Sequence, residues 1–227
     1  MACSLLAGYT PSDGGVASAP RALATPEHIV APTPTPTPTS TPQMVIVPSA
    51  PVRLEIPVAG IDSEIGQFEA GSDYIEPAED EVRPMWPTNY GSMIGGGNST
   101  YIVGHSSRYT EGSDKYVDRV FNRLFDRWAQ KSNVNVGDAI YITTAAAQRI
   151  CYTVYFVDAP TKEWLSGTQV QPDDASQAAY AAALAAYPFY KGYPDEAHLA
   201  TCFQGIDDVP SVNQLVIVAK QGGTGCN

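Results

Sequence analysis

Residues 198–220 read HLATCFQGIDDVPSVNQLVIVAK, in which two apolar runs flank a polar loop. The first run ends at Cys202, and the second ends at Ala219 and Lys220. Both runs have the composition of strands, and the loop between them contains glycine, aspartate and proline. The pattern predicts the last two strands of the domain, with a cysteine where the first of them opens into a loop. A rigid scaffold presents reactive groups at such points.

Strand patterns recur upstream from residue 52. VRLEIPVAGID predicts a strand that is broken at Pro57 and turns at Gly60, and STYIVGH (99–105) predicts a short strand entered from a glycine-rich loop. DAIYITT and RICYTVYFVDA, joined by AAAQ, predict a hairpin. The fold class expected from these patterns is mainly β, a mostly antiparallel barrel or sandwich without internal repeats.

Two segments predict helical insertions. In RVFNRLFDRWAQ (119–130), Val120, Leu124 and Trp128 recur four apart, which indicates a short amphipathic helix or turn. DDASQAAYAAALAAY (173–187) is rich in alanine and predicts a helix.

Charge excludes one class of partner. The 227 residues carry 13 Lys and Arg against 24 Asp and Glu, a net charge of −11, without any basic run. Binding to nucleic acid depends on clustered lysines and arginines, so we expect no nucleic-acid partner. The same balance argues against adsorption on an anionic membrane.

Residues 1–51 are expected to form a disordered tail and linker, and residues 52–227 a single domain. The repeat APTPTPTPTSTP favours extended polyproline II conformation, so the segment is interpreted as a spacer or as a solubilising tail. The opening MACSLLAGYT lacks the features of a signal peptide, and no stretch has the length of a membrane span. However, Cys3 before small residues is similar to the start of a bacterial lipoprotein. Any membrane attachment is therefore expected only through a lost or lipidated N-terminus.

The four cysteines do not indicate a metal site, because none has zinc-ligand spacing. No metal and no cofactor are expected. One pair is expected to be bridged if the protein is exported, with the pairing left open. Cys151 is expected in the core and Cys226 in a frayed end.

Cys202 and His105 are the candidate catalytic pair, because each ends a predicted strand. Gly104 is expected to allow another backbone to approach closely. A cysteine nucleophile needs such an imidazole, since a free thiol has a pKa of about 8.5. The alternative interpretation is a buried cysteine and a structural histidine.

Four motifs in order resemble the sortase family of cysteine transpeptidases, with classes E and F as candidate subfamilies. RLEIPVAGID is similar to the first strand of the family, GGGNSTYIVGH to its histidine strand, VFNRLFDRW with VNVGDAIYITT to its next turn and strand, and LATC to its nucleophile strand. The run LVIVAK resembles the last strand, so the resemblance spans residues 52–220.

The resemblance implies an eight-stranded β-barrel with short helical insertions, located outside the cytoplasm at the cell surface or tethered to a membrane. Cys202 would attack an LPXTG-type signal at the C-terminus of a partner protein and form a thioacyl enzyme. An amine from a cell-wall precursor or a pilin lysine would resolve it. His105 would be the acid and base, and Thr201 would support the oxyanion through its backbone or hydroxyl.

Sortases also carry an arginine near the start of the last strand, and this chain has no arginine after Arg149. The corresponding position falls on Val212, Asn213 or Gln214. Asn213 or Gln214 would supply a neutral amide donor at the cost of slower catalysis. Arg108 or Arg149 reaching in from elsewhere is a second explanation, although Arg149 is interpreted as a solvated surface charge. A non-catalytic sortase fold that binds sorting signals is the third.

We favour an active or weakly active transpeptidase. The alternatives are a binding module and a cysteine peptidase that uses water.

Four further residues carry weaker hypotheses, each with an ordinary structural role as the alternative. His198 would lie on the face of Cys202 or have a strand-edge role, Trp164 would line the substrate groove, and Asp207 and Asp208 would bind an amine or a cation. Lys220 is expected beyond the end of the barrel.

Overall fold

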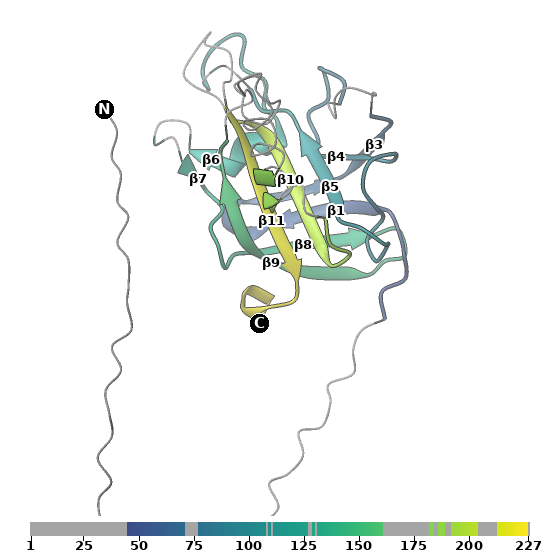
Figure 1. Ribbon diagram of the computed structural model, residues 1–227. Coiled ribbons are helices and arrows are strands. Elements are labelled where there is room, and N and C mark those ends of the chain that lie inside the picture. The colour runs from purple at the N-terminus through teal and green to yellow at the C-terminus, as the bar shows by residue number, and fades with distance from the viewer. Residues whose placement is uncertain are drawn as a thin grey trace, which may run out of the picture. The chain divides into compact units, whose positions relative to one another are not determined.

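The computed structural model describes residues 45–70, 77–107, 111–126, 131–160, 192–203 and 213–226, with 109, 129, 182–183 and 186–188. Strands dominate the described residues; two short 3-10 helices, η1 and η2, lie between strands, and a third, η3, follows the last strand (Figure 1). The elements are β1 (Pro51–Ile56), η1 (Pro57–Ala59), β2 (Ile61–Glu64), β3 (Gly66–Phe68), β4 (Met85–Pro87), β5 (Thr100–Gly104), η2 (Val120–Leu124), β6 (Phe125–Asp126), β7 (Lys131–Ser132), β8 (Ala139–Thr144), β9 (Arg149–Asp158), β10 (Glu196–Phe203), β11 (Asn213–Gln221) and η3 (Thr224–Cys226).

One sheet contains nine of these strands, in the order β2-β1-β8-β9-β11-β10-β5-β4-β3, and β6 and β7 form a small separate ribbon. Most neighbours are antiparallel, but β5 runs parallel to β10 and β3 runs parallel to β4. The predicted strand break is confirmed, because η1 follows β1 and Gly60 then adopts a left-handed φ of 61°. The predicted β8–β9 hairpin and the two C-terminal strands are confirmed as well.

A single segment, residues 61–68, joins the two ends of this sheet. Its first half pairs with β1 and its second half pairs with β4. Between them, the amide of Ile65 donates to Val52 O at 2.9 Å, and the amide of Gly66 donates to Pro84 O at 2.9 Å. The sheet therefore curls into a barrel. The main sheet has nine strands where eight were predicted, because this segment divides into two short strands with different partners.

Alternation of side chains along the strands fills the barrel interior. Every second residue of the central strands is buried inside, as Leu199, Leu215 and Ile217 are on β10 and β11. The largest fully buried apolar side chains of this interior cluster are Leu54, Ile56, Ile94, Ile102, Phe121, Leu124, Ile140, Ile142, Leu199, Leu215 and Ile217.

The intervening residues of β5, β10 and β11 form a second apolar cluster on the outer face of the sheet. Tyr101, Val103, Ala200, Val216 and Val218 are its buried members. The partly buried side chains packed against it are Phe68, Tyr90, Phe156 and Tyr187. The predicted catalytic residues come directly after this cluster in the sequence, because His105 is two residues after Val103 and Cys202 is two residues after Ala200.

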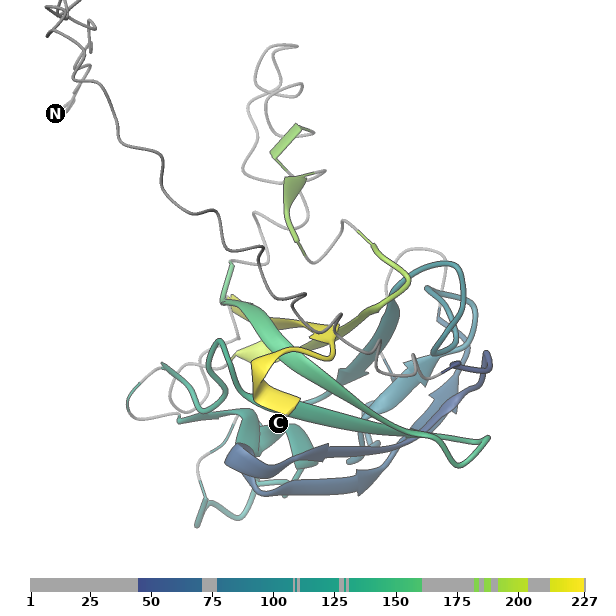
Figure 2. The ribbon, with the colours of Figure 1, turned by 90° about the horizontal axis from the view of Figure 1, so that it is seen from below.

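A disulfide joins Cys151 on β9 to Cys226 in η3. The expectation of a core cysteine and a frayed end is therefore wrong for this pair. Gly222 N–H donates to Cys151 O at 2.9 Å and the Thr153 hydroxyl donates to Gly222 O at 2.6 Å, which places the C-terminal segment along β9 (Figure 2). These contacts bring two cysteines together that are 75 residues apart in sequence.

The chain makes contacts with the barrel before the predicted domain boundary at residue 52. The side-chain amide of Gln148, in the β8–β9 turn, donates to Val45 O at 3.1 Å and accepts from Val47 N at 3.1 Å. Ser49 pairs with Ile94 as an isolated bridge. Within the predicted helix or turn 119–130, Val120–Leu124 form a short 3-10 helix and Phe125–Asp126 form β6, because the backbone is extended again at Phe125. Most of the predicted helix 173–187, like Trp128, lies outside the described residues.

Candidate active site

Parallel pairing of β5 and β10 brings the two predicted catalytic positions to one level. Ile102 stands beside Leu199, Val103 beside Ala200, and Gly104 beside Thr201. The next residues are His105, which directly follows the end of β5, and Cys202, which lies within β10. Main chains of paired strands run about 4.8 Å apart. The register therefore places the nucleophile and acid/base candidates on adjacent strands, one residue beyond the last matched pair.

Face alternation supports the same placement. Tyr101 and Val103 belong to the outer-face cluster, and His105, two residues after Val103 and just past the end of β5, continues that alternating series. Ala200 belongs to the same cluster, which assigns position 202 to that face of β10. The sequence prediction that a cysteine and a histidine share one side of the sheet is therefore consistent with the register.

His105 makes a defined contact through its ring. Its Nε2 lies 3.0 Å from the carbonyl oxygen of Pro77. A carbonyl oxygen only accepts, so Nε2 is the nitrogen that carries the proton in this contact. In the neutral imidazole, Nδ1 then holds the lone pair and is the basic atom.

The residues on either side of His105 are held by η2 and its flanks. A Cβ added to Gly104 would lie 2.7 Å from the ring of Phe121. The glycine therefore makes room for an aromatic side chain, whereas the sequence predicted the close approach of another backbone. The amide of Ser107 donates to Asn122 Oδ1 at 2.6 Å. The close packing of the Phe121 ring on Gly104 explains why the last residue of β5 lacks a side chain.

Gln214 stands directly opposite Cys202 in the antiparallel β10–β11 pair, and Asn213 stands opposite Phe203. Residues that face each other across such a pair lie on the same side of the sheet. Of the two described candidates for the missing arginine, the register thus places Gln214, and not Asn213, on the side of Cys202. Val212 lies outside the described residues.

Thr201 belongs to the opposite side of β10. It faces Leu215 of the interior cluster and is only 2% exposed. Its hydroxyl is buried without a hydrogen-bond partner among the described residues. Support for an oxyanion near Cys202 would therefore have to come from the Thr201 main chain rather than from its hydroxyl.

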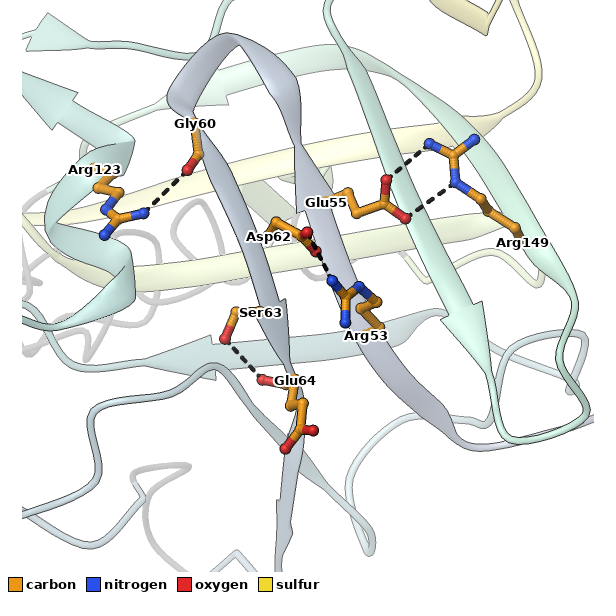
Figure 3. Close-up of polar contacts among 8 residues, drawn as sticks. All are labelled: Arg53, Glu55, Gly60, Asp62, Ser63, Glu64, Arg123 and Arg149. Carbon is orange, nitrogen blue, oxygen red and sulfur yellow. Dashed lines mark hydrogen bonds and ion pairs between the residues drawn. The ribbon is translucent and has the colours of Figure 1, made fainter.

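The other candidate cations lie away from Cys202 or outside the described residues. Arg149 is an exposed surface charge, as expected, and its Nε and Nη2 donate to both carboxylate oxygens of Glu55 at 3.0 and 2.9 Å (Figure 3). Its guanidinium also lies 3.7 Å from the centre of the Tyr141 ring. Lys220 was expected beyond the end of the barrel, but it lies within β11, at the other end from Gln214, and pairs with Asp195 at 3.3 Å.

His198 is fully buried and has a polar partner that the sequence did not reveal. Its Nε2 lies 3.0 Å from Glu196 Oε2, and the Tyr155 hydroxyl donates to Glu196 Oε1 at 2.7 Å. Burial, together with the bond to Glu196, raises the pKa of Tyr155. The strand-edge role is wrong for His198, because β10 lies between β11 and β5 within the sheet.

Some predicted residues lie outside the described part of the chain: Arg108, Trp164, Asp207 and Asp208. Sequence reasoning, in turn, missed Pro77, Phe121, Asn122 and Arg119. No sequence pattern near these residues indicates them, because each contacts residues 104–107 only through the tertiary structure. Among the described residues, no helix has both the length and the apolar character that a membrane span requires.

Solved structures of sortases resemble this chain. A Clostridium perfringens sortase D5 transpeptidase is 17% identical, over 77% of this chain and 79% of that chain, with a TM-score of 0.43. Sortase C1 from Streptococcus suis is 16% identical, over 77% and 74% of the two chains, with a TM-score of 0.45. A lid mutant of sortase A from Corynebacterium diphtheriae is 16% identical, over 78% and 73%, with a TM-score of 0.44.

No family model matches the chain, and no curated protein matches it either. The likeness to the solved structures is distant at these values.

Proposed function

We propose that this protein is a sortase-like cysteine transpeptidase that cleaves an LPXTG-type sorting signal and transfers the acyl group to an amine. One observation carries the proposal: the parallel register of Gly104 and Thr201, after which the next residues are His105, directly after β5, and Cys202 on the adjacent strand β10. A thiol and an imidazole at one level of a sheet form the minimal nucleophile and base pair of acyl transfer.

The reaction proceeds in two steps. The Cys202 thiolate attacks the threonine carbonyl, the C–N bond to glycine breaks, and His105 gives a proton to the leaving amine. The acceptor amine then attacks the thioester and loses its proton to His105, and the thiolate leaves as the new amide forms. Electrons and protons balance over the cycle, so no cofactor is required.

The side chain of Gln214 is the proposed neutral donor to the oxyanion. It stands where an arginine is expected and directly opposite Cys202. A neutral amide donates a hydrogen bond without adding the charge that would lower the thiol pKa. We therefore expect slow turnover.

Substrates and place of action follow from the same proposal. The partners are proteins with a C-terminal sorting signal, and the acceptor is an amine of a cell-wall precursor or a pilin lysine. Disulfides persist in oxidising compartments, so the Cys151–Cys226 bond supports a site of action outside the cytoplasm.

The test uses the full chain with an LPXTG peptide, with and without triglycine, and intact-mass detection. We expect an acyl adduct that requires Cys202 and His105, and an amide product that requires triglycine. Cys202→Ala and His105→Ala are the two variants, and Cys3→Ala is the control. Hydrolysis without transfer would indicate a cysteine peptidase, and absence of any adduct would favour a binding module.

A further inference from the structure

The residue before His105 and the two residues after it are all contacted from one short segment, residues 119–122. The ring of Phe121 covers Gly104, Arg119 Nη1 donates to Ser106 O at 3.1 Å, and the Asn122 side chain accepts from Ser107 N. The position before the histidine and the two after it are therefore fixed by the same element.

Arg119 has a second contact that connects this segment to the ring of His105. Its Nη2 donates to Glu79 O at 2.5 Å, and Glu79 lies two residues after Pro77, whose carbonyl contacts His105 Nε2. Nearby, Val120 N donates to Val82 O at 3.0 Å, so the two segments also pair through their main chains. One guanidinium thus joins the main chain that carries His105 to the main chain that carries its acceptor.

We propose that Arg119 is the positioning residue for His105, which selects the tautomer with the proton on Nε2 and thereby makes Nδ1 the nitrogen that exchanges protons with Cys202 and the substrate. The planar guanidinium suits this role, because its donors are fixed in a fork and reach two carbonyls at once. Lysine would present a single flexible ammonium.

The proposal rests on the transpeptidase function for its catalytic part, and its structural part is measurable without any substrate. The chain has three histidines, so the imidazole nitrogen signals of His105 are assigned by comparison with His105→Gln. Nitrogen-15 spectra of the full chain then report which ring nitrogen carries the proton in the neutral form.

Arg119→Met is the principal variant, Arg119→Lys is the conservative one, and Arg123→Met is the matched control. Arg123 lies in η2, for which Arg119 is the N-cap, and it also donates to a main-chain carbonyl, Gly60 O at 3.0 Å, but on the side of β2 (Figure 3). A general loss of helix stability would affect both sites alike, whereas loss of positioning affects Arg119 alone.

We expect wild type and Arg123→Met to show the Nε2-protonated tautomer. Arg119→Met should show a mixture of tautomers and a fall in kcat of about 10- to 10²-fold with KM nearly unchanged, the size of effect that a small misplacement of a catalytic group produces. Arg119→Lys should recover part of that loss.

An unchanged tautomer in folded Arg119→Met overturns the proposal, whether or not the rate changes. If Arg119→Met does not fold, the Arg119→Lys spectrum decides, and a wild-type tautomer with a wild-type rate in that variant would also overturn it. If the wild-type protein forms no acyl adduct, the transpeptidase function fails, while the tautomer spectra still decide the role of Arg119.

Discussion

Gln214 on β11 lies directly opposite Cys202 on β10, while its neighbour Asn213 lies opposite Phe203. Adjacent residues of one strand point to opposite sides of the sheet. A single strand therefore offers a position that faces the proposed nucleophile and, next to it, a position that does not.

This relationship predicts the effect of restoring the arginine. Gln214→Arg should raise the rate of adduct formation at Cys202 by about 10²-fold, because a charged donor stabilises both the thiolate and the oxyanion. The rate is measured by rapid-quench intact mass. Asn213→Arg is the control and should leave the rate unchanged. Equal gains from both variants would contradict the assignment of Gln214.

The packing of Phe121 on Gly104 predicts a second outcome. Gly104→Ala places a methyl group 2.7 Å from the ring, and overpacking of this kind costs about 1 to 3 kcal/mol. We expect a lower free energy of unfolding in urea and a displaced His105. Gly97→Ala, where nothing lies within 4 Å of the added carbon, is the control. Combination with Phe121→Leu should restore stability, and a lack of restoration would argue against the contact.

The C-terminal disulfide predicts a loss of stability without loss of the reactive thiol. Replacing Cys151 and Cys226 by serine together should lower the free energy of unfolding by about 2 to 4 kcal/mol, since the bond closes a long loop. Chemical denaturation followed by tryptophan fluorescence measures the change. Adduct formation at Cys202 should persist below the melting transition. A double variant as stable as wild type would show that the contacts of Gly222 and Thr153 alone hold the C-terminus.

Glu81 predicts a dependence of stability on acid. Hydrogen bonds from Arg83 lower the pKa of this carboxyl from its ordinary value of 4.5 to about 2. The folded state therefore binds its proton less readily than the unfolded state, so the stabilisation is complete above about pH 5 and is lost as the pH falls toward 2.

Glu81→Gln should consequently be less stable than wild type near neutral pH, and the difference should shrink as the pH falls below 5 and through 2. Melting temperatures across this range test it, with the exposed Glu111→Gln as control. A difference that does not change with pH would assign the effect to packing rather than to charge.

Local sequence chemistry predicted most of the strands. Pro57 lacks an amide donor and Gly60 tolerates a left-handed φ, so the break after the first strand could be recognised from two residues. The β8–β9 hairpin was predicted from two β-branched runs around a short connection. The 3-10 geometry of residues 120–124 was not predicted, because a four-residue apolar spacing also fits an α-helix.

The parts of the site that depend on tertiary pairing could not be predicted from the sequence. Three registers were open for the missing arginine, and only the β10–β11 pairing places Gln214 opposite Cys202. The Glu196–His198 contact requires that both residues be buried on one interior strand, which no periodicity of the sequence indicates. The pairing of Cys151 with Cys226 also depends on tertiary structure, because it joins β9 to the 3-10 helix η3, 75 residues away in the sequence.

The hydrogen bonds of the Gln148 side chain with Val45 and Val47, and the disulfide at Cys226, have a practical consequence. Both belong to the end of the barrel where β9 begins, and Cys202 lies at the end where β9 finishes (Figure 1). An affinity tag, a fused protein or a bead attached near Val45 or near Cys226 would therefore leave the opposite end of the barrel, which holds Cys202, accessible to large polypeptides.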